Sequence, residues 1–273
     1  MEKIGFIGTG NMGEALIRGI LENGVYKKDQ IIVFDKIKEK LSSVSKRFGL
    51  KEANSNADLV KNSEVILICV KPQDMYDLLD EIKGCLKESQ LLVSIAAGIP
   101  TDAIINKIGK QIPTVRVMPN TPALVQKGIS GISYGRNIKE MHKKIVRKIF
   151  GAVGEIIEVE EELIDAITAV SGSGPGYVFR IMEYMVEAAM RIGIGEEDAK
   201  KLVIQTFLGS AYLAKESGRS ISELRKMVTS PKGTTEAGLS VFEKEGLRDI
   251  ISHAIEEAYK RAKQIKKQAG ERL

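Results

Sequence analysis

The chain has 273 residues, 43% of them hydrophobic and 28% charged, a composition typical of globular proteins with one large domain or two ordinary ones. Its net charge of +5 is spread along the sequence, no basic cluster is interleaved with aromatic residues, and tryptophan is absent, which argues against nucleic-acid binding. The longest apolar run, residues 65–70, is too short to cross a bilayer, and no secretory leader opens the chain, so we expect a cytoplasmic location and no membrane partner.

A glycine-rich turn opens the sequence. Residues 4–20 read IGFIGTGNMGEALIRGI, which is a short apolar run, a G-x-G-x-x-G frame and a helical pattern. Gly8 permits a tight turn, Gly10 lets the backbone approach a pyrophosphate, and Gly13 lets the helix pack against a sheet. The N–H groups at the helix start would face an anion. A glycine loop without a ligand is the alternative, but its place between a strand-like and a helix-like run favours dinucleotide binding.

Short apolar strands then alternate with helices through the first half of the chain. Strands are expected at residues 4–7, 31–34, 51–53, 65–70, 91–95, 115–118, 128–134 and 155–159. Helices are expected at residues 36–48, 57–61, 74–86, 101–107 and 138–150. This alternation predicts a parallel, doubly wound α/β sheet, a Rossmann-like dinucleotide-binding domain over residues 1–160.

The ribose contact expected of such a domain falls on Asp35, 22 residues after Gly13. A carboxylate there takes the ribose hydroxyls of NAD, whereas Lys36 and Lys38 would attract the 2′-phosphate of NADP. The two signals conflict, so the sequence predicts NAD or NADP with the preference open. A role for Asp35 as a helix N-cap is a further interpretation, compatible with the first.

Three later strand ends lie on the same expected edge of the sheet, at residues 70–73, 94–99 and 116–122. Cys69, just before the first of them, is most simply a small core residue. His142 and His253 are far apart in the sequence and neither has cysteine or acidic neighbours at ligand spacing, so we expect no metal site.

No convincing strand follows residue 160. Helices are expected at residues 161–170, 177–191, 196–217, 221–227, 235–245 and 247–268, with a break at 171–176 and a loop at 229–235. This pattern predicts an all-α domain over residues 161–273. The helix at 177–191 is apolar nearly all round and needs cover on every side, either within the monomer or at a dimer interface. Its methionines and the small residues of the next helix favour the dimer.

A series of motifs carries a family resemblance across nearly the whole chain. GFIGTGNMG, VKPQ, SIAAGI, RVMPNTPA, AVSGSGPGYVF and VTSPKGTTEAGL, in this order, resemble those of pyrroline-5-carboxylate reductase. The last motif is the most specific, and the first is shared with many dehydrogenases. The resemblance implies an NAD(P)-dependent oxidoreductase that reduces 1-pyrroline-5-carboxylate to L-proline, the last step of proline biosynthesis. It also implies a homodimer with interleaved helical domains, or a ring of dimers.

The resemblance also assigns residues. It implies that the cofactor contacts Ile7, Gly8, Thr9, Gly10, Asn11, Met12, Gly13, Asp35, Asn56, Cys69, Val70, Lys71, Pro72, Ile95, Ala96, Ala97 and Asn120. It implies that the substrate is held by Ser230, Gly233, Thr234 and Thr235, with Thr235 as the catalytic residue.

The chemistry of the last motif fits that assignment. Gly233, Thr234 and Thr235 open a helix, so their N–H groups suit a small carboxylate, and the Thr235 hydroxyl is placed to hydrogen-bond an imine nitrogen. A protonated imine brings its own positive charge, so positioning rather than acid–base chemistry would carry the rate. A plain N-capping loop is the structural alternative, with Thr234 or Thr235 as the cap.

The sequence departs from the family pattern at a few positions. Lys232 replaces a glycine of the usual SPGGTT, where a positive φ is expected, and Met227 stands where a polar side chain is usual. Gly176 replaces a common alanine. These departures bear on substrate contacts, not on the class of reaction.

Two other functions compete. A 3-hydroxyacid dehydrogenase of similar layout would place a Lys and then an Asn where this chain has Arg180 and Glu183, and arginine is a poor proton donor. A nucleotide-binding sensor without catalysis is the second, and the intact loop at 229–235 argues against it.

Overall fold

The computed structural model describes residues 2–270 and divides the chain into two compact units. One holds the residues up to Ser173 together with the end of the last helix from Ala258, and the other holds Gly174–Glu257. The first unit extends past residue 160, the expected domain border, because the segment after it packs on two strands of the sheet.

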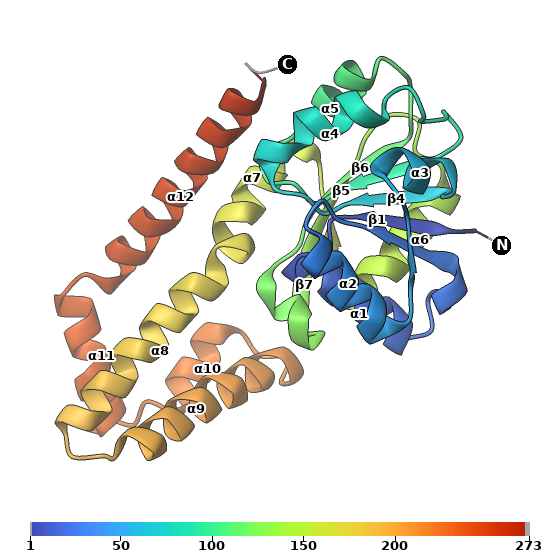
Figure 1. Cartoon of the computed structure of the whole chain (residues 1–273). Coiled ribbons are helices and arrows are strands. Elements are labelled where there is room, and N and C mark those ends of the chain that lie inside the picture. The colour runs from blue at the N-terminus through green and yellow to red at the C-terminus, as the bar shows by residue number, and fades with distance from the viewer. Residues whose placement is uncertain (1, 271–273) are drawn as a thin grey trace. The chain divides into compact units, whose positions relative to one another are not determined.

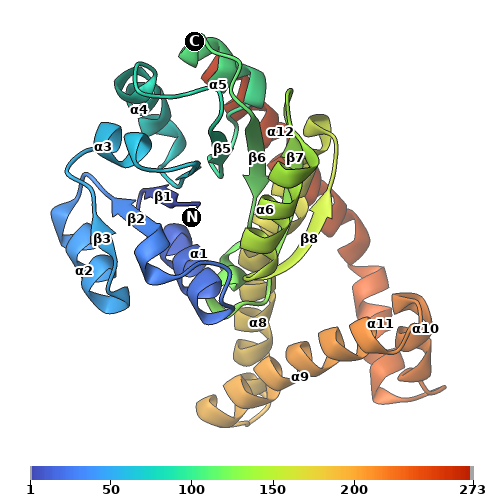
Figure 2. The same cartoon turned by 90° about the vertical axis from the view of Figure 1, so that its right-hand side faces the viewer.

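The first unit is built on one eight-stranded sheet in the order β3-β2-β1-β4-β5-β6-β7-β8 (Figure 1). The strands are β1 (Ile4–Ile7), β2 (Ile31–Phe34), β3 (Lys51–Glu52), β4 (Val65–Ile68), β5 (Leu91–Ser94), β6 (Thr114–Met118), β7 (Gly128–Tyr134) and β8 (Gly154–Glu158). All neighbours pair in parallel except β6 and β7, which are antiparallel, so the predicted doubly wound parallel sheet is confirmed apart from this one pair (Figure 2). The reason is the short connection of residues 119–127, because a parallel return needs a crossover of a dozen residues or more.

Helices cover both faces of this sheet, as the alternation of elements predicts. One face carries α1 (Asn11–Glu22), α2 (Lys38–Phe48) and α6 (Glu140–Gly151). The other carries α3 (Asn56–Lys61), α4 (Met75–Ile82) and α5 (Thr101–Ile108). Side chains alternate between the two cores along each central strand: Phe6 faces the first and Ile7 the second. Short 3₁₀ turns lie at η1 (Lys28–Gln30), η2 (Pro72–Asp74) and η3 (Thr121–Val125).

The strand β4 ends two residues earlier than the apolar run predicts. Cys69 N still donates to Ile7 O at 2.8 Å, after which the chain leaves the sheet. Helix α4 is likewise shorter than the expected 74–86: it begins one residue late, after the 3₁₀ turn Pro72–Asp74, and it ends four residues early, at Ile82. Because β4 ends at Ile68 and α4 begins only at Met75, the residues between them form a loop and a short turn at the carboxyl edge of the sheet.

The segment between the sheet and the helical unit differs from the expected helix followed by a break. It is a 3₁₀ turn η4 (Glu161–Leu163), a short helix α7 (Ile164–Ile167) and a π-helix η5 (Thr168–Gly172), and α8 (Gly174–Arg191) follows after one residue. The prediction of a break over 171–176 is therefore wrong. Pro175 does not interrupt α8 because it lies in the first turn, where proline is tolerated.

The second unit is all helical, as predicted. It contains α8, α9 (Glu196–Glu216), α10 (Ile221–Met227), α11 (Thr234–Lys244) and the first part of α12 (Leu247–Gly270). Helix α8 has no buried residue in the single chain. Even its large apolar side chains Phe179 and Tyr184 are more than half exposed. Among residues 2–270, no helix has both the length and the apolar character that crossing a bilayer requires.

Candidate active site

The glycine-rich turn between β1 and α1 has the backbone geometry that its sequence predicts. Gly8 has a φ of +100°, and a Cβ there would lie 2.8 Å from Cys69 O. A Cβ on Gly13 would lie 2.4 Å from Gly8 O, so the helix can approach the turn only without a side chain. A Cβ on Gly10 would meet no atom of the described residues within 4 Å. Gly10 is the N-cap residue of α1, and no side chain among residues 2–270 accepts a hydrogen bond from the N–H groups at the start of this helix. The first N–H groups of α1 thus stay open to an anion.

Asp35, at the end of β2, holds this turn in place. Its Oδ2 accepts hydrogen bonds from Thr9 N at 2.8 Å and Thr9 Oγ1 at 3.1 Å, and its Oδ1 accepts one from Ile37 N at 2.9 Å. Asp35 is not the N-cap of α2, because Ile37 occupies that position. The carboxylate fixes the loop that would bind the pyrophosphate and also borders the cavity expected for the ribose.

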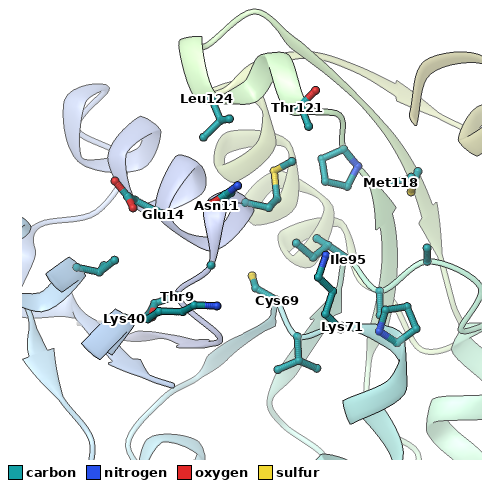
Figure 3. A pocket seen from close by; sticks show the side chains of 18 of the residues that line it. Thr9, Asn11, Glu14, Lys40, Cys69, Lys71, Ile95, Met118, Thr121 and Leu124 are labelled. Carbon is teal, nitrogen blue, oxygen red and sulfur yellow. The ribbon is translucent and has the colours of Figure 1, made fainter. Parts of the chain in front are cut away.

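A cavity of about 700 Å³ opens above this turn (Figure 3). Its walls include the predicted cofactor residues Thr9, Gly10, Asn11, Met12, Cys69, Val70, Lys71, Pro72, Ile95, Ala96 and Ala97. Met118, Pro119 and Thr121 also border it, from the predicted strand end 116–122, and residues that the sequence analysis did not single out complete it: Glu14, Glu39, Lys40, Ser43, Val44 and Leu124. The cavity lies at the carboxyl ends of β1 and β4, where the strand order reverses, which is the place for a ligand in an open α/β sheet.

A second cavity of about 410 Å³ shares Gly10, Lys40, Cys69, Val70 and Lys71 with the first. The predicted residues Ile7, Gly8, Asp35 and Asn56 border it, together with Lys36, Ile37, Asp74, Asp77, Leu78 and Glu81. Of the predicted cofactor residues, only Gly13 and Asn120 border neither cavity.

Asn56 leaves an open hydrogen-bond acceptor at the second cavity. Its Nδ2 donates to Glu81 Oε2 at 2.8 Å, and its Oδ1 is buried without a hydrogen-bond partner among the described residues. A ribose hydroxyl or an amino group is the kind of donor that would satisfy this oxygen. The unfilled space at Gly10, the open start of α1 and this acceptor fit a dinucleotide.

Charges of both signs border the second cavity. Lys36 forms an ion pair with Asp74, which raises the pKa of the lysine. Lys40 and Lys71 border both cavities, while Asp77 and Glu81 border the second. This mixture of lysines and carboxylates leaves the choice between NAD and NADP open.

Cys69 lies between the two cavities and its sulfur faces the larger one in Figure 3. Burial raises the pKa of its thiol to about 12. A neutral thiol is a poor nucleophile at physiological pH, so Cys69 contributes shape to the wall and not reactivity. Among residues 2–270, no three His, Cys, Asp or Glu side chains are grouped as a metal ion would require.

Asn120 is committed to the backbone. Its Oδ1 accepts from Ile129 N at 2.9 Å, and its Nδ2 donates to Ser171 O at 3.2 Å. These bonds fix the loop whose neighbours Met118, Pro119 and Thr121 border the larger cavity.

The loop of the last motif lies in the helical unit and begins α11. Gly233 N donates to Ser230 O at 3.0 Å, which closes a turn with Pro231 and Lys232 at its centre. Lys232 has a φ of +59°, so the prediction of a positive φ at this departure from glycine is confirmed. Gly233 is the N-cap of α11, and therefore neither Thr234 nor Thr235 caps the helix as the structural alternative requires. Their N–H groups belong to the first turn and their hydroxyls are not used in capping.

One cluster was missed by the sequence analysis. Arg116, in the middle of β6, is buried and faces Asp165 and Glu161 from the segment after β8. An arginine within an apolar strand is the signal that could have found it, because a buried guanidinium needs carboxylate partners.

Fold and cavity together define the class of protein: an oxidoreductase-type Rossmann unit with a dinucleotide cavity, followed by a helical unit. Comparison with known proteins agrees and goes further. Residues 161–265 match the family model for pyrroline-5-carboxylate reductase dimerisation, and residues 3–98 match that for NADP oxidoreductase, coenzyme F420-dependent.

Full-length relatives identify the family. The chain is 35% identical to pyrroline-5-carboxylate reductase 2 of Bacillus subtilis over 98% of its own length and 96% of that protein. The structure of the Coxiella burnetii pyrroline-5-carboxylate reductase superposes with a TM-score of 0.91 at 37% identity, covering 97% of this chain and 98% of that one. The Plasmodium falciparum pyrroline carboxylate reductase, solved with NADP bound, gives 0.88 at 34% identity, covering 97% and 98%. The chain belongs to the pyrroline-5-carboxylate reductase family, whose members are NAD(P)-dependent oxidoreductases, and its helical region is the family's dimerisation domain.

Proposed function

We propose that this protein reduces 1-pyrroline-5-carboxylate to L-proline with NADPH or NADH, as the last step of proline biosynthesis. The observation that carries the proposal is that one chain contains both a cavity that fits a dinucleotide and, in its helical unit, a helix start at Gly233 that no side chain of the described residues caps. The first suits a reduced nicotinamide cofactor, and the second suits a small carboxylate.

The cofactor, when bound, supplies the hydride. The chain's own residues would hold it: the glycine turn and the N–H groups of α1 at the pyrophosphate, and Asp35 and Asn56 around the adenosine. Cys69–Pro72 and Ile95–Ala97 would border the nicotinamide half, in the larger cavity. The apolar walls there exclude water from the reacting carbon.

Substrate binding falls to the loop of the last motif. We assign the substrate carboxylate to the N–H groups of Thr234 and Thr235, because the N–H of Gly233, which the sequence analysis included, already donates to Ser230 O. The ring nitrogen is assigned to the Thr235 hydroxyl, with Ser230 and Gly233 lining the site. An iminium nitrogen already carries positive charge, so the Thr235 hydroxyl orients the ring and does not need to protonate it.

The 3-hydroxyacid dehydrogenase alternative is weaker. Arg180, at the position where such enzymes carry a lysine, forms an ion pair with Glu183 at 2.9 Å. Arginine is a poor proton donor, so Arg180 does not suit general acid catalysis of carbonyl reduction. The intact substrate loop argues against a sensor without catalysis.

For the assembly, we propose a homodimer through the helical domain, with a ring of dimers as the larger form. The exposed apolar residues of α8 and the match of residues 161–265 to a dimerisation model support the dimer. The cytoplasm is the location we propose, from the sequence alone.

Oxidation of NADPH or NADH on addition of 1-pyrroline-5-carboxylate tests the function. We expect absorbance at 340 nm to fall, with proline formed in equal amount. Tight cofactor binding without oxidation would favour the sensor, and oxidation with a 3-hydroxyacid or its keto form alone would favour the dehydrogenase. Rates with the two cofactors at matched concentrations decide the preference.

A further inference from the structure

Arg116 is the largest fully buried side chain among the described residues. Its Nη2 lies 3.0 Å from Asp165 Oδ1, and its Nη1 lies 3.6 Å from Glu161 Oε1. Asp165 Oδ2 lies 3.8 Å from Lys266 Nζ, so two cations meet two carboxylates. Glu161 also accepts hydrogen bonds from the backbone N–H and the hydroxyl of Thr101, at 2.8 and 2.5 Å. The cluster joins β6, the start of α5, the segment 161–165 and the end of α12.

Stability alone does not account for this cluster. The side chains of Arg116 and Asp165 are only 1% and 4% exposed, so both charges have lost their water. The attraction inside the protein repays that loss poorly, and apolar side chains of similar volume are often as stable or more so. A buried pair that adds little net stability is better explained by the position that it fixes.

The part of the structure next to this ion pair is the wall of the larger cavity. Arg116 and Met118 are two residues apart on β6, so their side chains point to the same face of the strand. Asp165 lies beside Arg116 on that face, and Gly172 lies beside Met118: a Cβ on Gly172 would be 2.5 Å from Met118 Cε. Residues 165–172 therefore run along β6, and Met118 borders the cavity.

The segment so held contains an unusual helix. Thr168–Gly172 forms a π-helix, in which Ser173 N donates to Thr168 O at 2.8 Å. π-Helical turns are rare and are often found at functional sites. Gly131 of β7 leaves room for Ile167, since a Cβ there would lie 2.7 Å from Ile167 Cδ1. The segment is thus packed closely on the sheet, and the ion pair of Arg116 with Asp165 lies at one end of it.

We propose that Arg116 is a positioning residue for the reductase reaction. Through Asp165 and Glu161 it sets the register of residues 161–172 along β6, and so holds Met118 at the nicotinamide end of the cavity. The inference rests on the proposed function for its kinetic readout.

The test compares Arg116→Met with the double variant Arg116→Met/Asp165→Leu in the full-length protein. The single variant leaves a buried carboxylate short of its main partner, and we expect its Tm to fall by roughly 5–15 °C. The double variant removes the two buried charges together, Glu161 keeps its hydrogen bonds from Thr101 and Lys266 is partly exposed, so we expect it to regain the parental Tm. It should still lose kcat by about 10- to 100-fold, because small misplacements of a reacting group are costly. The emission spectrum of bound NADPH should change, with an unchanged dissociation constant.

Arg147→Met is the matched control, since Arg147 pairs with Glu158 and Glu140 away from both cavities. It should keep the parental kcat and NADPH emission. If the double variant regains both Tm and kcat, Arg116 is merely structural and the proposal is overturned.

Gly172→Ala provides a second test that leaves the ion pair intact, in case the double variant does not fold. Its Cβ must displace the end of Met118, so we expect a lower kcat and altered NADPH emission at a Tm close to that of the parent. If kcat and the NADPH emission of Gly172→Ala both equal those of the parent, the proposal is also overturned. If the parent itself does not reduce 1-pyrroline-5-carboxylate, the proposed function fails, but the melting and emission measurements still decide the role of Arg116.

Discussion

Gly10→Ala separates cofactor binding from folding more cleanly than any other change in the glycine turn. Gly10 has a φ of −69°, which alanine adopts freely, and no atom of the chain lies within 4 Å of the added Cβ. The lower entropy of the unfolded chain stabilises the variant by about 0.4–1 kcal/mol. The poorer N-cap of α1 costs about the same amount, so Tm should move by less than about 3 °C.

The effect of Gly10→Ala on cofactor affinity should be larger than its effect on stability. If the pyrophosphate lies against Gly10, the methyl group overpacks that contact at a cost of about 1–3 kcal/mol. The dissociation constants for NADPH and NADH should therefore rise roughly 5- to 150-fold. Titration by NADPH fluorescence, with calorimetry for the oxidised cofactors, measures this change, and differential scanning fluorimetry measures Tm.

Two further glycines give the controls. Gly84→Ala, where the added Cβ also meets no atom within 4 Å, should leave cofactor affinity unchanged and raise Tm by at most about 4 °C, because no N-cap is lost there. Gly13→Ala places its Cβ 2.4 Å from Gly8 O and should lower both Tm and cofactor affinity. Parental affinity in Gly10→Ala would refute the placement of the pyrophosphate at this turn.

Three other predictions concern single side chains. Thr235→Ala should lower kcat or raise the KM for 1-pyrroline-5-carboxylate while cofactor affinity stays parental, and Thr235→Ser should retain most of the activity; an equal loss of cofactor affinity would contradict the assigned role. Lys232→Gly should keep Tm, whereas Lys232→Ile should lower it by about 2–4 °C, because a β-branched residue resists the positive φ; equal Tm values would count against that backbone. The raised pKa of Cys69 means that its neutral form stabilises the fold up to the ordinary thiol pKa, near 8.5, and that this stability is lost as the pH rises toward about 12. The Tm of the parent should thus fall more than that of Cys69→Ala between about pH 8 and pH 11, and parallel falls would show that the thiol is not buried.

The sequence determined most of the first unit, because its signals are local. Strands such as Ile31–Phe34 are continuous apolar runs, and the αL cap at Gly49 ends α2 where a glycine predicts it. The turn at Gly8 needs no information from elsewhere in the chain, since φ and close approach are properties of the glycine frame itself. The helical character after residue 160 was also predicted from local patterns, whereas the positive φ at Lys232 was expected only from the glycine of the family pattern.

Tertiary structure decided what depends on residues far apart in the sequence. The antiparallel pairing of β7 follows from the geometry of a connection, which an apolar pattern does not encode. Lys40 and Leu124 became cavity residues because a separate helix and a 3₁₀ turn meet there. Arg116 reads as an isolated charge in a strand until the fold brings Asp165, 49 residues later, to 3.0 Å. Periodicity reports which face of an element is buried, but only the packed chain shows which side chains meet across that face.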